Sequence, residues 1–325
     1  MRALECTLCP RSCVIPEGGA GDCRVRVHLD GKLVAVTYGR PSAIHIDPME
    51  KKPLFHFLPG TSIFSIATAG CNLHCRFCQN WQLSQRGAEE MEVVYQAPPD
   101  EVVAMAMDKQ CQSIAYTYSE PLVFYEYTRA TSEVARDKGL KNVLVSAGYI
   151  NRAPMRALAT WIDAANIDIK AFDDRFYRDV CGATLKPVLD ALVIMKEANV
   201  WIEITNLVIP GLNDDLARVR EMAVWIRRYL GAGTPLHFSR FYPMYQMQNL
   251  PPTPAETLIQ CRTEALSAGL EHVYVGNLAG NVGEETRCPR DNTLLIRRFG
   301  FTIQENRLEN GRCPVCRQAI AGVWA

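Results

Sequence analysis

The sequence predicts an α/β fold, a partial or full (β/α) barrel with small Cys-rich lobes at the N- and C-termini. Apolar, β-prone runs alternate with helical patterns through residues 61–280, which is typical of a parallel sheet. Polar or ligand-type residues follow these runs, at the strand ends where barrel enzymes carry their chemistry. Clusters of cysteine also lie near both ends of the 325-residue chain.

The strands and helices are assigned from these alternating patterns. Seven strands are predicted, at 62–68, 113–118, 142–146, 166–169, 200–207, 236–241 and 272–275. Helices are predicted between most of them, for example at 100–109, 123–138, 154–159, 187–198 and 216–230. Six or seven such units fit a partial or complete barrel better than a short open sheet.

Two smaller lobes are predicted outside this barrel. Residues 1–60 hold a cysteine cluster, a hairpin around Asp30-Gly31 and a proline-rich stretch from Pro41 to Pro59. An Asp-Gly pair between two β-prone runs favours a tight hairpin turn. Residues 281–325 are short, polar and punctuated by glycine and proline, and we expect a hairpin within 292–307.

Composition narrows the classes of function. The chain has 35 basic and 35 acidic residues, so nucleic acid is an unlikely partner, because such binders normally carry a basic excess. No apolar run approaches the length of a membrane span. The N-terminal residues lack the apolar region of a signal peptide, and we therefore expect a cytoplasmic protein.

The chain has 13 cysteines, which in a reducing compartment indicate metal sites rather than disulfides. In the central cluster, Cys71, Cys75 and Cys78 have the spacing C-x3-C-x2-C. Three thiolates on one loop can hold three irons of a [4Fe–4S] cluster and leave the fourth iron open. A zinc site or three unrelated buried cysteines are the alternatives, although zinc usually has four ligands.

This motif resembles the signature of the radical S-adenosylmethionine (SAM) enzymes, in which the residue before the last cysteine is aromatic, as Phe77 is here. The resemblance implies a (β/α) barrel and an open iron that binds the amino and carboxylate groups of SAM. It also implies a one-electron reduction that cleaves SAM to methionine and a 5′-deoxyadenosyl radical, which abstracts hydrogen from a substrate.

Residues after the second and third predicted strands match the family's cofactor-binding positions. Ser119 and Glu120 lie where the family binds the amino group of SAM, and Glu120 can accept hydrogen bonds from an ammonium group. Of the common Gly-Gly-Glu pattern, only the glutamate is kept. Ser146 and Gly148 lie where contacts with the ribose are expected.

The fourth strand ends in Asp168-Ile-Lys170, which resembles the motif of pyruvate formate-lyase activating enzymes. There the acid and the lysine contact the ribose and the methionine carboxylate, and alternation places both side chains on one strand face. A plain salt bridge between them is the alternative. Asn206 lies on the strand that lines the family's pocket, or simply on a buried strand.

A closer resemblance covers nearly the whole chain. Four strings look like the radical enzyme of the AmmeMemoRadiSam system, a group associated with Memo-like and AMMECR-like proteins. They are Asp47-Pro-Met-Glu-Lys-Lys-Pro-Leu-Phe-His-Phe, Cys78-Gln-Asn-Trp, Tyr116-Thr-Tyr-Ser-Glu-Pro and His237-Phe-Ser-Arg-Phe-Tyr-Pro-Met. The chain departs from that group at Ala147, where asparagine is usual, and in a missing C-terminal cysteine.

The N-terminal cluster is Cys6-x2-Cys9-x3-Cys13-x9-Cys23. Four thiolates within eighteen residues suit structural zinc and equally suit a [4Fe–4S] cluster that relays electrons. Zinc is slightly favoured, because the spacing matches neither common ferredoxin pattern.

The C-terminal cluster resembles a zinc ribbon in which a carboxylate replaces one cysteine. Its candidate ligands are Cys288, Asp291, Cys313 and Cys316, and carboxylates do ligate zinc. An eroded site that binds no metal and is held by its own small core is the alternative.

We therefore expect an iron–sulfur oxidoreductase that cleaves SAM, with flavodoxin or ferredoxin as electron donor. Resemblance to activating enzymes implies hydrogen abstraction from a glycine of a partner protein, and a peptide or small metabolite is the alternative substrate. A non-catalytic metal scaffold or an electron-transfer protein would not need the acidic and basic residues of the SAM pocket.

Overall fold

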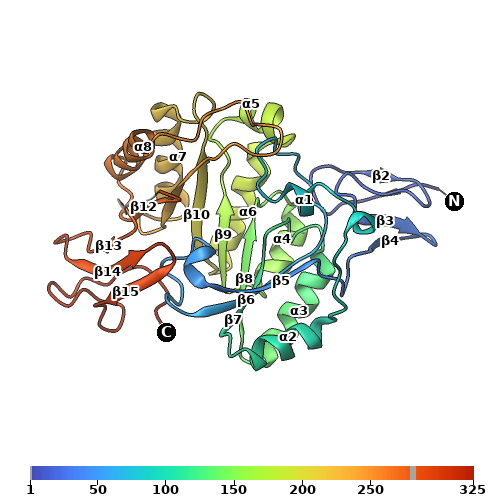
Figure 1. Cartoon of the computed structure of the whole chain (residues 1–325), viewed down its shortest axis with the longest axis horizontal. Coiled ribbons are helices and arrows are strands. Elements are labelled where there is room, and N and C mark those ends of the chain that lie inside the picture. Colours follow the sequence, from blue (N-terminus) through green and yellow to red (C-terminus); the bar gives the residue numbers. More distant parts are fainter. Residues whose placement is uncertain (1, 279–282) are drawn as a thin grey trace.

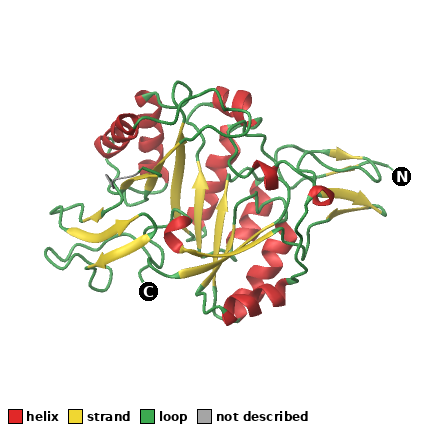
Figure 2. Ribbon diagram, in the orientation of Figure 1, coloured by secondary structure: helices red, strands yellow, loops and turns green. Residues whose placement is uncertain are grey.

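The computed structural model describes residues 2–278 and 283–325, and its centre is one eight-stranded sheet with helices packed around it (Figures 1 and 2). The strand order is β12-β11-β10-β9-β8-β7-β6-β5. Neighbouring strands from β6 to β12 are parallel, and β5 is antiparallel to β6. The eight strands are β5 (Ala43–Pro48), β6 (Ser62–Ala67), β7 (Ser113–Tyr116), β8 (Lys141–Ser146), β9 (Ala164–Asp168), β10 (Trp201–Val208), β11 (Leu236–Arg240) and β12 (Val273–Gly276).

All seven predicted strands are present, with ends that differ by no more than two residues. Strand β5 lies in the proline-rich stretch and was not predicted. It is an edge strand with Pro48 as its last residue, and edges tolerate proline because no neighbour needs its missing N–H group.

The sheet is a partial barrel. In the described part of the chain, β12 and β5 form its two edges and do not pair with each other. The full (β/α) barrel expected as an alternative is therefore not formed. Antiparallel β5 occupies the free edge of β6, the position in which a closing parallel strand would pair.

The helices connect successive strands along the outside of this curved sheet (Figure 1). The principal helices are α2 (Pro99–Asp108), α3 (Tyr125–Asp137), α4 (Arg152–Ala159), α6 (Leu185–Glu197), α7 (Leu216–Tyr229) and α8 (Ala255–Ser267). Short helical turns are η1 (Met49–Lys51), α1 (Trp81–Ser84), η2 (Ala88–Glu90), α5 (Asp174–Phe176) and the π-helix η3 (Tyr177–Cys181). Asp215 caps α7 by accepting hydrogen bonds from the N–H groups of Ala217 and Arg218, which satisfies donors that have no partner within the helix.

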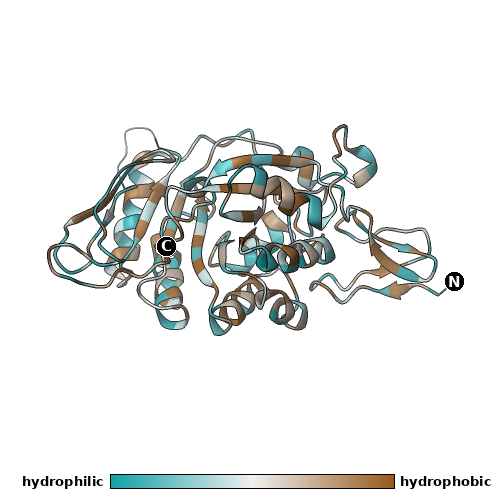
Figure 3. Ribbon diagram, turned by 90° about the horizontal axis from the view of Figure 1, so that it is seen from below, coloured by the Kyte–Doolittle hydropathy of each residue, from teal (hydrophilic) through white to brown (hydrophobic). Residues whose placement is uncertain are grey.

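The core lies between the sheet and the apolar faces of these helices. Figure 3 shows hydrophobic segments in the strands and a mixture of hydrophobic and hydrophilic positions along the helices. All four residues of β7 are buried, as are Leu192, Ile226 and Leu258 of the helices α6, α7 and α8. No helix among the described residues is long and apolar enough to cross a membrane.

The N-terminal lobe projects from one end of the molecule (Figure 1). It has two small hairpins, the first formed by β1 (Leu4–Glu5) with β2 (Val14–Ile15) and the second by β3 (Arg26–Leu29) with β4 (Lys32–Ala35). The second is the hairpin predicted at Asp30-Gly31. Because β5 lies within residues 1–60 and pairs with β6, the main sheet begins before the boundary expected at residue 60.

The C-terminal lobe lies at the opposite end of the sheet (Figure 1). Its antiparallel sheet consists of β13 (Thr286–Arg287), β14 (Leu294–Phe299) and β15 (Thr302–Asn306), so the hairpin expected within 292–307 is present. The chain end returns to the body of the protein, where the N–H of Leu58 donates to the carbonyl of Val323 at 2.8 Å.

Candidate active site

A cavity of about 440 Å³ opens at the carboxyl ends of the parallel strands, within the size range of small-molecule sites. Most of the site residues predicted for the barrel line it. They are Cys71, Cys75, Phe77, Cys78, Ser119, Glu120, Ser146, Asp168 and Lys170. Residues from four different strand ends thus meet in one space, as expected for a barrel enzyme.

The cysteine loop after β6 is held by backbone contacts with the π-helix η3. The N–H of His74 donates to the carbonyl of Cys181 at 2.8 Å, and the N–H of Arg76 donates to that of Val180 at 3.0 Å. Gly70 begins the loop with a φ of 94°, a backbone conformation that favours glycine. This docking fixes the loop at the mouth of the barrel.

The three thiols of this loop fit an iron–sulfur cluster. Burial raises the pKa of Cys71 and of Cys78, so these sulfurs need a bound cation to persist as thiolates. Three thiols that face one cavity supply three ligands of a [4Fe–4S] cluster and leave room for another molecule.

Glu120 is fixed by three hydrogen bonds at the end of β7. Its carboxylate accepts from the Ser146 hydroxyl at 2.6 Å, from the N–H of Ala147 at 2.9 Å and from the N–H of Leu122 at 3.1 Å. Burial nevertheless raises the pKa of Glu120. The carboxylate is therefore pre-positioned for a cationic ligand, which would stabilise its charge.

Asp168 and Lys170 form an ion pair of 2.6 Å at the wall of the cavity. Burial alone would lower the pKa of Lys170, but the adjacent Asp168 carboxylate more than offsets this and the pKa is raised. Asp168 keeps 29% of its side chain exposed, compared with 15% for Lys170. The salt bridge considered from the sequence therefore exists, and both partners still face the cavity.

Gly148 and Asn206 are not among the residues that line the cavity. Gly148 has a φ of 67°, and an added Cβ would lie 3.2 Å from Ile167, so this position needs a small residue. Asn206 donates from its amide to the carbonyl of Ile169 at 2.7 Å. These two residues support the neighbouring strand ends rather than the cavity surface.

The far wall of the cavity contains residues to which the sequence analysis assigned no role. Glu50, Lys52 and Phe55 come from the Asp47–Phe57 string, and Glu284 and Phe301 come from the C-terminal lobe. The string was noted only as a mark of resemblance. No local sequence pattern predicts that Glu284 and Phe301 line the cavity, because their position depends on the packing of the C-terminal lobe against the sheet.

Lys52 is the buried base of this wall. Burial lowers its pKa to about 8, in spite of a 2.6 Å ion pair with Asp47. Asp47 also accepts hydrogen bonds from Ser65 at 2.7 Å and from Tyr118. Asp47 thus holds the ammonium group of Lys52 beside the Tyr118 ring, 4.3 Å from the ring centroid.

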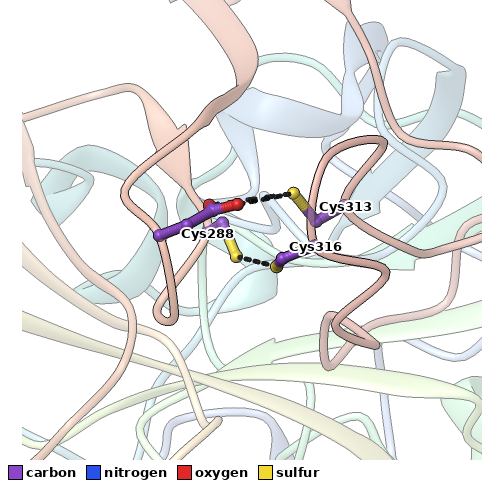
Figure 4. Close-up of side chains that lie close together, drawn as sticks. Cys288, Cys313 and Cys316 are labelled. Carbon is purple, nitrogen blue, oxygen red and sulfur yellow. Dashed lines mark hydrogen bonds between the residues drawn. The ribbon is translucent and has the colours of Figure 1, made fainter.

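The C-terminal candidate ligands lie together (Figure 4). The ligand atoms of Cys288, Asp291, Cys313 and Cys316 are all within 4.8 Å of one another. The sulfurs of Cys288 and Cys316 are 3.5 Å apart, and the Cys313 sulfur is 3.6 Å from an oxygen of Asp291. These separations suit one tetrahedral zinc ion, whose sulfur ligands lie about 3.8 Å apart.

The N-terminal cysteines Cys6, Cys9, Cys13 and Cys23 lie in one small lobe and are all partly exposed. The N–H of Cys6 donates to the carbonyl of Cys13 at 2.8 Å, and the N–H of Ser12 donates to that of Cys9 at 3.2 Å. The Cys13 sulfur accepts a hydrogen bond of 3.4 Å from the N–H of Asp22.

Known proteins share both the sequence and the fold of this chain. The model of the Radical SAM superfamily matches residues 65–223. The uncharacterized protein MJ0808 of Methanocaldococcus jannaschii is 44% identical over 319 residues, which are 98% of this chain and 95% of that protein.

More distant similarity extends to activating enzymes. Benzylsuccinate synthase activating enzyme of Thauera aromatica is 22% identical over 54% of this chain and 57% of that enzyme. Pyruvate formate-lyase-activating enzyme of Clostridium pasteurianum is 22% identical over 47% of this chain and 65% of that enzyme. The chain thus spans less than two thirds of the length of each. A radical SAM methyltransferase from Sphaerobacter thermophilus has the same fold, with a TM-score of 0.54, 15% identity and 68% of each chain covered.

Proposed function

The chain belongs to the radical SAM superfamily, and from that premise we propose that it cleaves SAM at a [4Fe–4S] cluster held by Cys71, Cys75 and Cys78. When bound, the cluster supplies the single electron that cleaves SAM into methionine and a 5′-deoxyadenosyl radical. The observation that carries the proposal is the cavity, in which the three thiols lie with Glu120, Asp168 and Lys170.

In this proposal the charged groups of the cavity bind and orient the cofactor. Glu120, fixed by Ser146 and Ala147, accepts hydrogen bonds from the ammonium group of SAM. Lys170 pairs with the methionine carboxylate, and Asp168, whose side chain is the more exposed of the two, accepts from a ribose hydroxyl. Ser119 adds a buried hydroxyl oxygen that has no hydrogen-bond partner among the described residues.

The proposed substrate is a glycine of a partner protein, from which hydrogen is abstracted. Support comes from the similarity to activating enzymes that act on benzylsuccinate synthase and pyruvate formate-lyase. The resemblance to the AmmeMemoRadiSam group adds Memo-like and AMMECR-like proteins as proposed partners. A peptide or small metabolite is the alternative, and it is supported by the extra wall that Glu284 and Phe301 add to the cavity.

Zinc is proposed for the C-terminal lobe, held by Cys288, Cys313, Cys316 and Asp291. Its support is the tight grouping of the four ligand atoms. Zinc has no redox chemistry, so its role is to hold the lobe together and thereby maintain one wall of the cavity.

The test is formation of 5′-deoxyadenosine, measured by mass spectrometry after anaerobic reconstitution with iron and sulfide and reduction with dithionite in the presence of SAM. Wild type should form the product and Cys78→Ala should not. Cys111→Ala is the matched control, because Cys111 is buried outside the cavity lining and should tolerate the change. Product from Cys78→Ala at the wild-type rate would refute the assignment of these thiols.

A further inference from the structure

We infer that Lys52 is a catalytic residue that forms a Schiff base with the carbonyl group of a small 2-oxo acid bound in the cavity. The inference rests on the proposed function and specifies its alternative substrate, a small metabolite. The residues that carry it are Lys51, Lys52, Asp47 and Tyr118, which meet at the far wall of the cavity.

The backbone holds Lys52 in this wall. Lys52 follows the helical turn η1, where its N–H donates to the carbonyl of Met49 at 2.9 Å. The next residue, Pro53, is also fixed, because its carbonyl accepts a 2.7 Å hydrogen bond from the side chain of Asn166 on β9. Lys52 lines the cavity although only 1% of its side chain is exposed. It therefore faces a molecule bound in the cavity rather than bulk solvent.

Two lysines share one carboxylate at this point. Asp47, which is buried, accepts hydrogen bonds from Lys52 at 2.6 Å and from Lys51 at 2.8 Å. It also accepts from the hydroxyl groups of Ser65, at 2.7 Å, and Tyr118. Lys51 is 44% exposed and alone would neutralise Asp47, so the second, buried lysine adds a desolvation cost that a structural ion pair does not need. This cost indicates a role for Lys52 beyond the ion pair.

A comparison with another lysine of the cavity shows how this arrangement affects Lys52. The pKa of Lys170 is raised in spite of burial, because Asp168 lies 2.6 Å away. Burial, with Lys51 nearby, instead lowers the pKa of Lys52 to about 8. At pH 7 roughly a tenth of Lys52 is then the neutral amine, against well under about one thousandth of an ordinary lysine. The neutral amine is the nucleophile, and desolvation beside a second cation is a known means of producing it.

The reaction of this amine with a carbonyl group is balanced within the site. The Lys52 ammonium passes one proton to Asp47, and its nitrogen attacks the carbonyl carbon to form a C–N bond. The carbonyl oxygen takes a second proton from the nitrogen and the first one from Asp47, and it leaves as water. The nitrogen keeps its third proton and gains a C=N bond. The resulting iminium has the charge of the original ammonium, so no oxidant or reductant is needed.

Tyr118 positions both partners of this reaction. Its hydroxyl accepts a 3.3 Å hydrogen bond from the amino group of Lys52 and donates to Asp47. Its ring centroid lies 4.3 Å from the Lys52 nitrogen, and an aromatic face at this distance favours a cation, which both the ammonium and the iminium are. The carbonyl of Tyr118 accepts a 2.8 Å hydrogen bond from Asn80. Its φ of 65° is unusual for a bulky residue and is typical of positions held for function.

The charge at this wall selects the class of carbonyl compound. Lys51 and Lys52 carry two positive charges beside the single negative charge of Asp47. Lys51 also lines the cavity, so it can pair with a carboxylate next to the carbonyl group that Lys52 attacks. A 2-oxo acid has this arrangement of groups.

The Schiff base also suits the proposed radical chemistry. A hydrogen atom leaves the carbon next to the iminium carbon and is taken up by the 5′-deoxyadenosyl radical, which becomes 5′-deoxyadenosine. The unpaired electron that remains on the substrate is delocalised over the C=N bond. Lys52 thus holds the substrate and stabilises the radical formed from it.

The experiment traps the Schiff base by reduction. The full chain is incubated at pH 7 with pyruvate and sodium cyanoborohydride, which converts the iminium to a stable secondary amine. Modified lysines are then located by mass spectrometry of peptides. We expect Lys52 to be modified at least about tenfold faster than Lys141, because its amine fraction is larger and Lys141 is a surface lysine that is 50% exposed. Equal rates, or no modification of Lys52, would overturn the inference.

An arginine variant separates the amine from its charge. Lys52→Arg keeps the positive charge but has no nucleophilic amine, so modification of the protein should fall to that of its surface lysines. Lys141→Arg is the matched control and should leave the modification of Lys52 unchanged. Modification of Lys52→Arg at the wild-type rate would overturn the inference. If this variant does not fold, the positions modified in wild type still decide.

Acetone tests the class of substrate, because a methyl group replaces the carboxylate of pyruvate. The rate for Lys52 relative to Lys141 should be lower with acetone than with pyruvate, and an equal ratio would overturn the assignment of a 2-oxo acid. Trapping needs neither the iron–sulfur cluster nor SAM. It therefore separates failure of this inference from failure of the proposed function, which the formation of 5′-deoxyadenosine tests.

Discussion

Arg298 and Phe55 are 243 residues apart in the sequence, and the Arg298 guanidinium donates a 2.7 Å hydrogen bond to the Phe55 carbonyl. The same guanidinium lies 4.3 Å from the centroid of the Phe55 ring and donates to Thr286 at 2.8 Å. One side chain of the C-terminal lobe is thus anchored in the string that forms the far wall of the cavity. The lobe is a fixed part of that wall rather than a loosely attached domain.

We expect Arg298→Met to lower the free energy of unfolding by about 2–4 kcal/mol. The change leaves the Phe55 carbonyl without this donor and removes the cation 3.8 Å from the buried Glu50 carboxylate. Urea denaturation measures the loss. Arg297→Met is the matched control, because the side chain of Arg297 is 48% exposed. This substitution should change the free energy of unfolding by no more than about 0.5 kcal/mol. Equal effects of the two substitutions would contradict the anchoring role.

Glu120→Gln should weaken SAM binding to the reconstituted protein about 10- to 100-fold. A charge-assisted hydrogen bond contributes roughly 1.5–3 kcal/mol, and the glutamine amide would also place a donor beside the ammonium group of SAM. Calorimetry or equilibrium dialysis measures the affinity. Glu133→Gln is the control, since Glu133 lies on the surface of α3, paired with Arg129. An unchanged dissociation constant for Glu120→Gln would remove this residue from the proposed site.

Asp291→Cys should increase retention of zinc by the C-terminal lobe. The four ligand atoms already lie within 4.8 Å of one another, and a fourth thiolate suits zinc better than a carboxylate does. Zinc per chain is measured by elemental analysis during titration with a chelator, with Asp291→Ala expected to release zinc at a lower chelator concentration than wild type. If neither wild type nor Asp291→Cys binds zinc, the lobe is the eroded site considered from its sequence.

The strands of the sheet and the residues at their carboxyl ends could be predicted from the sequence because their signals are local. Alternating apolar runs identify the strands of a parallel sheet, and the strand ends then bring Cys71, Glu120 and Asp168 together. Asn206 was placed at the cavity although its side chain turns to the carbonyl of Ile169. Alternation alone does not distinguish the face that lines the cavity from the face that supports a neighbouring strand.

The remainder could not be predicted, because it depends on contacts between distant segments. Nothing near Arg298 indicates that it meets Phe55, and nothing near Arg11 indicates that it donates to the carbonyl of Asn72. Strand β5 was hidden by the prolines around it, which normally argue against a strand. Packing of the two lobes against the barrel is therefore the information that the structure adds.

Acid should destabilise the protein through two buried histidines, His56 and His272, whose ring centroids are 4.4 Å apart. Burial lowers the pKa of His272 to about 4 and also lowers that of His56. The unfolded chain therefore binds these protons first, near pH 6.5. Stability is complete above about pH 6.5 and falls as the pH decreases towards about 4, with about 3 kcal/mol lost through His272 alone.

Melting temperature measured from pH 8 to pH 4 tests this linkage. His272→Phe removes one titrating group, and its curve should fall less steeply between pH 6.5 and 4 than the wild-type curve. His45→Gln is the control, because His45 is exposed and its loss should leave the slope unchanged. Parallel curves for wild type and His272→Phe would mean that carboxylates alone set the acid sensitivity, since a histidine that keeps its ordinary pKa on folding contributes no pH dependence.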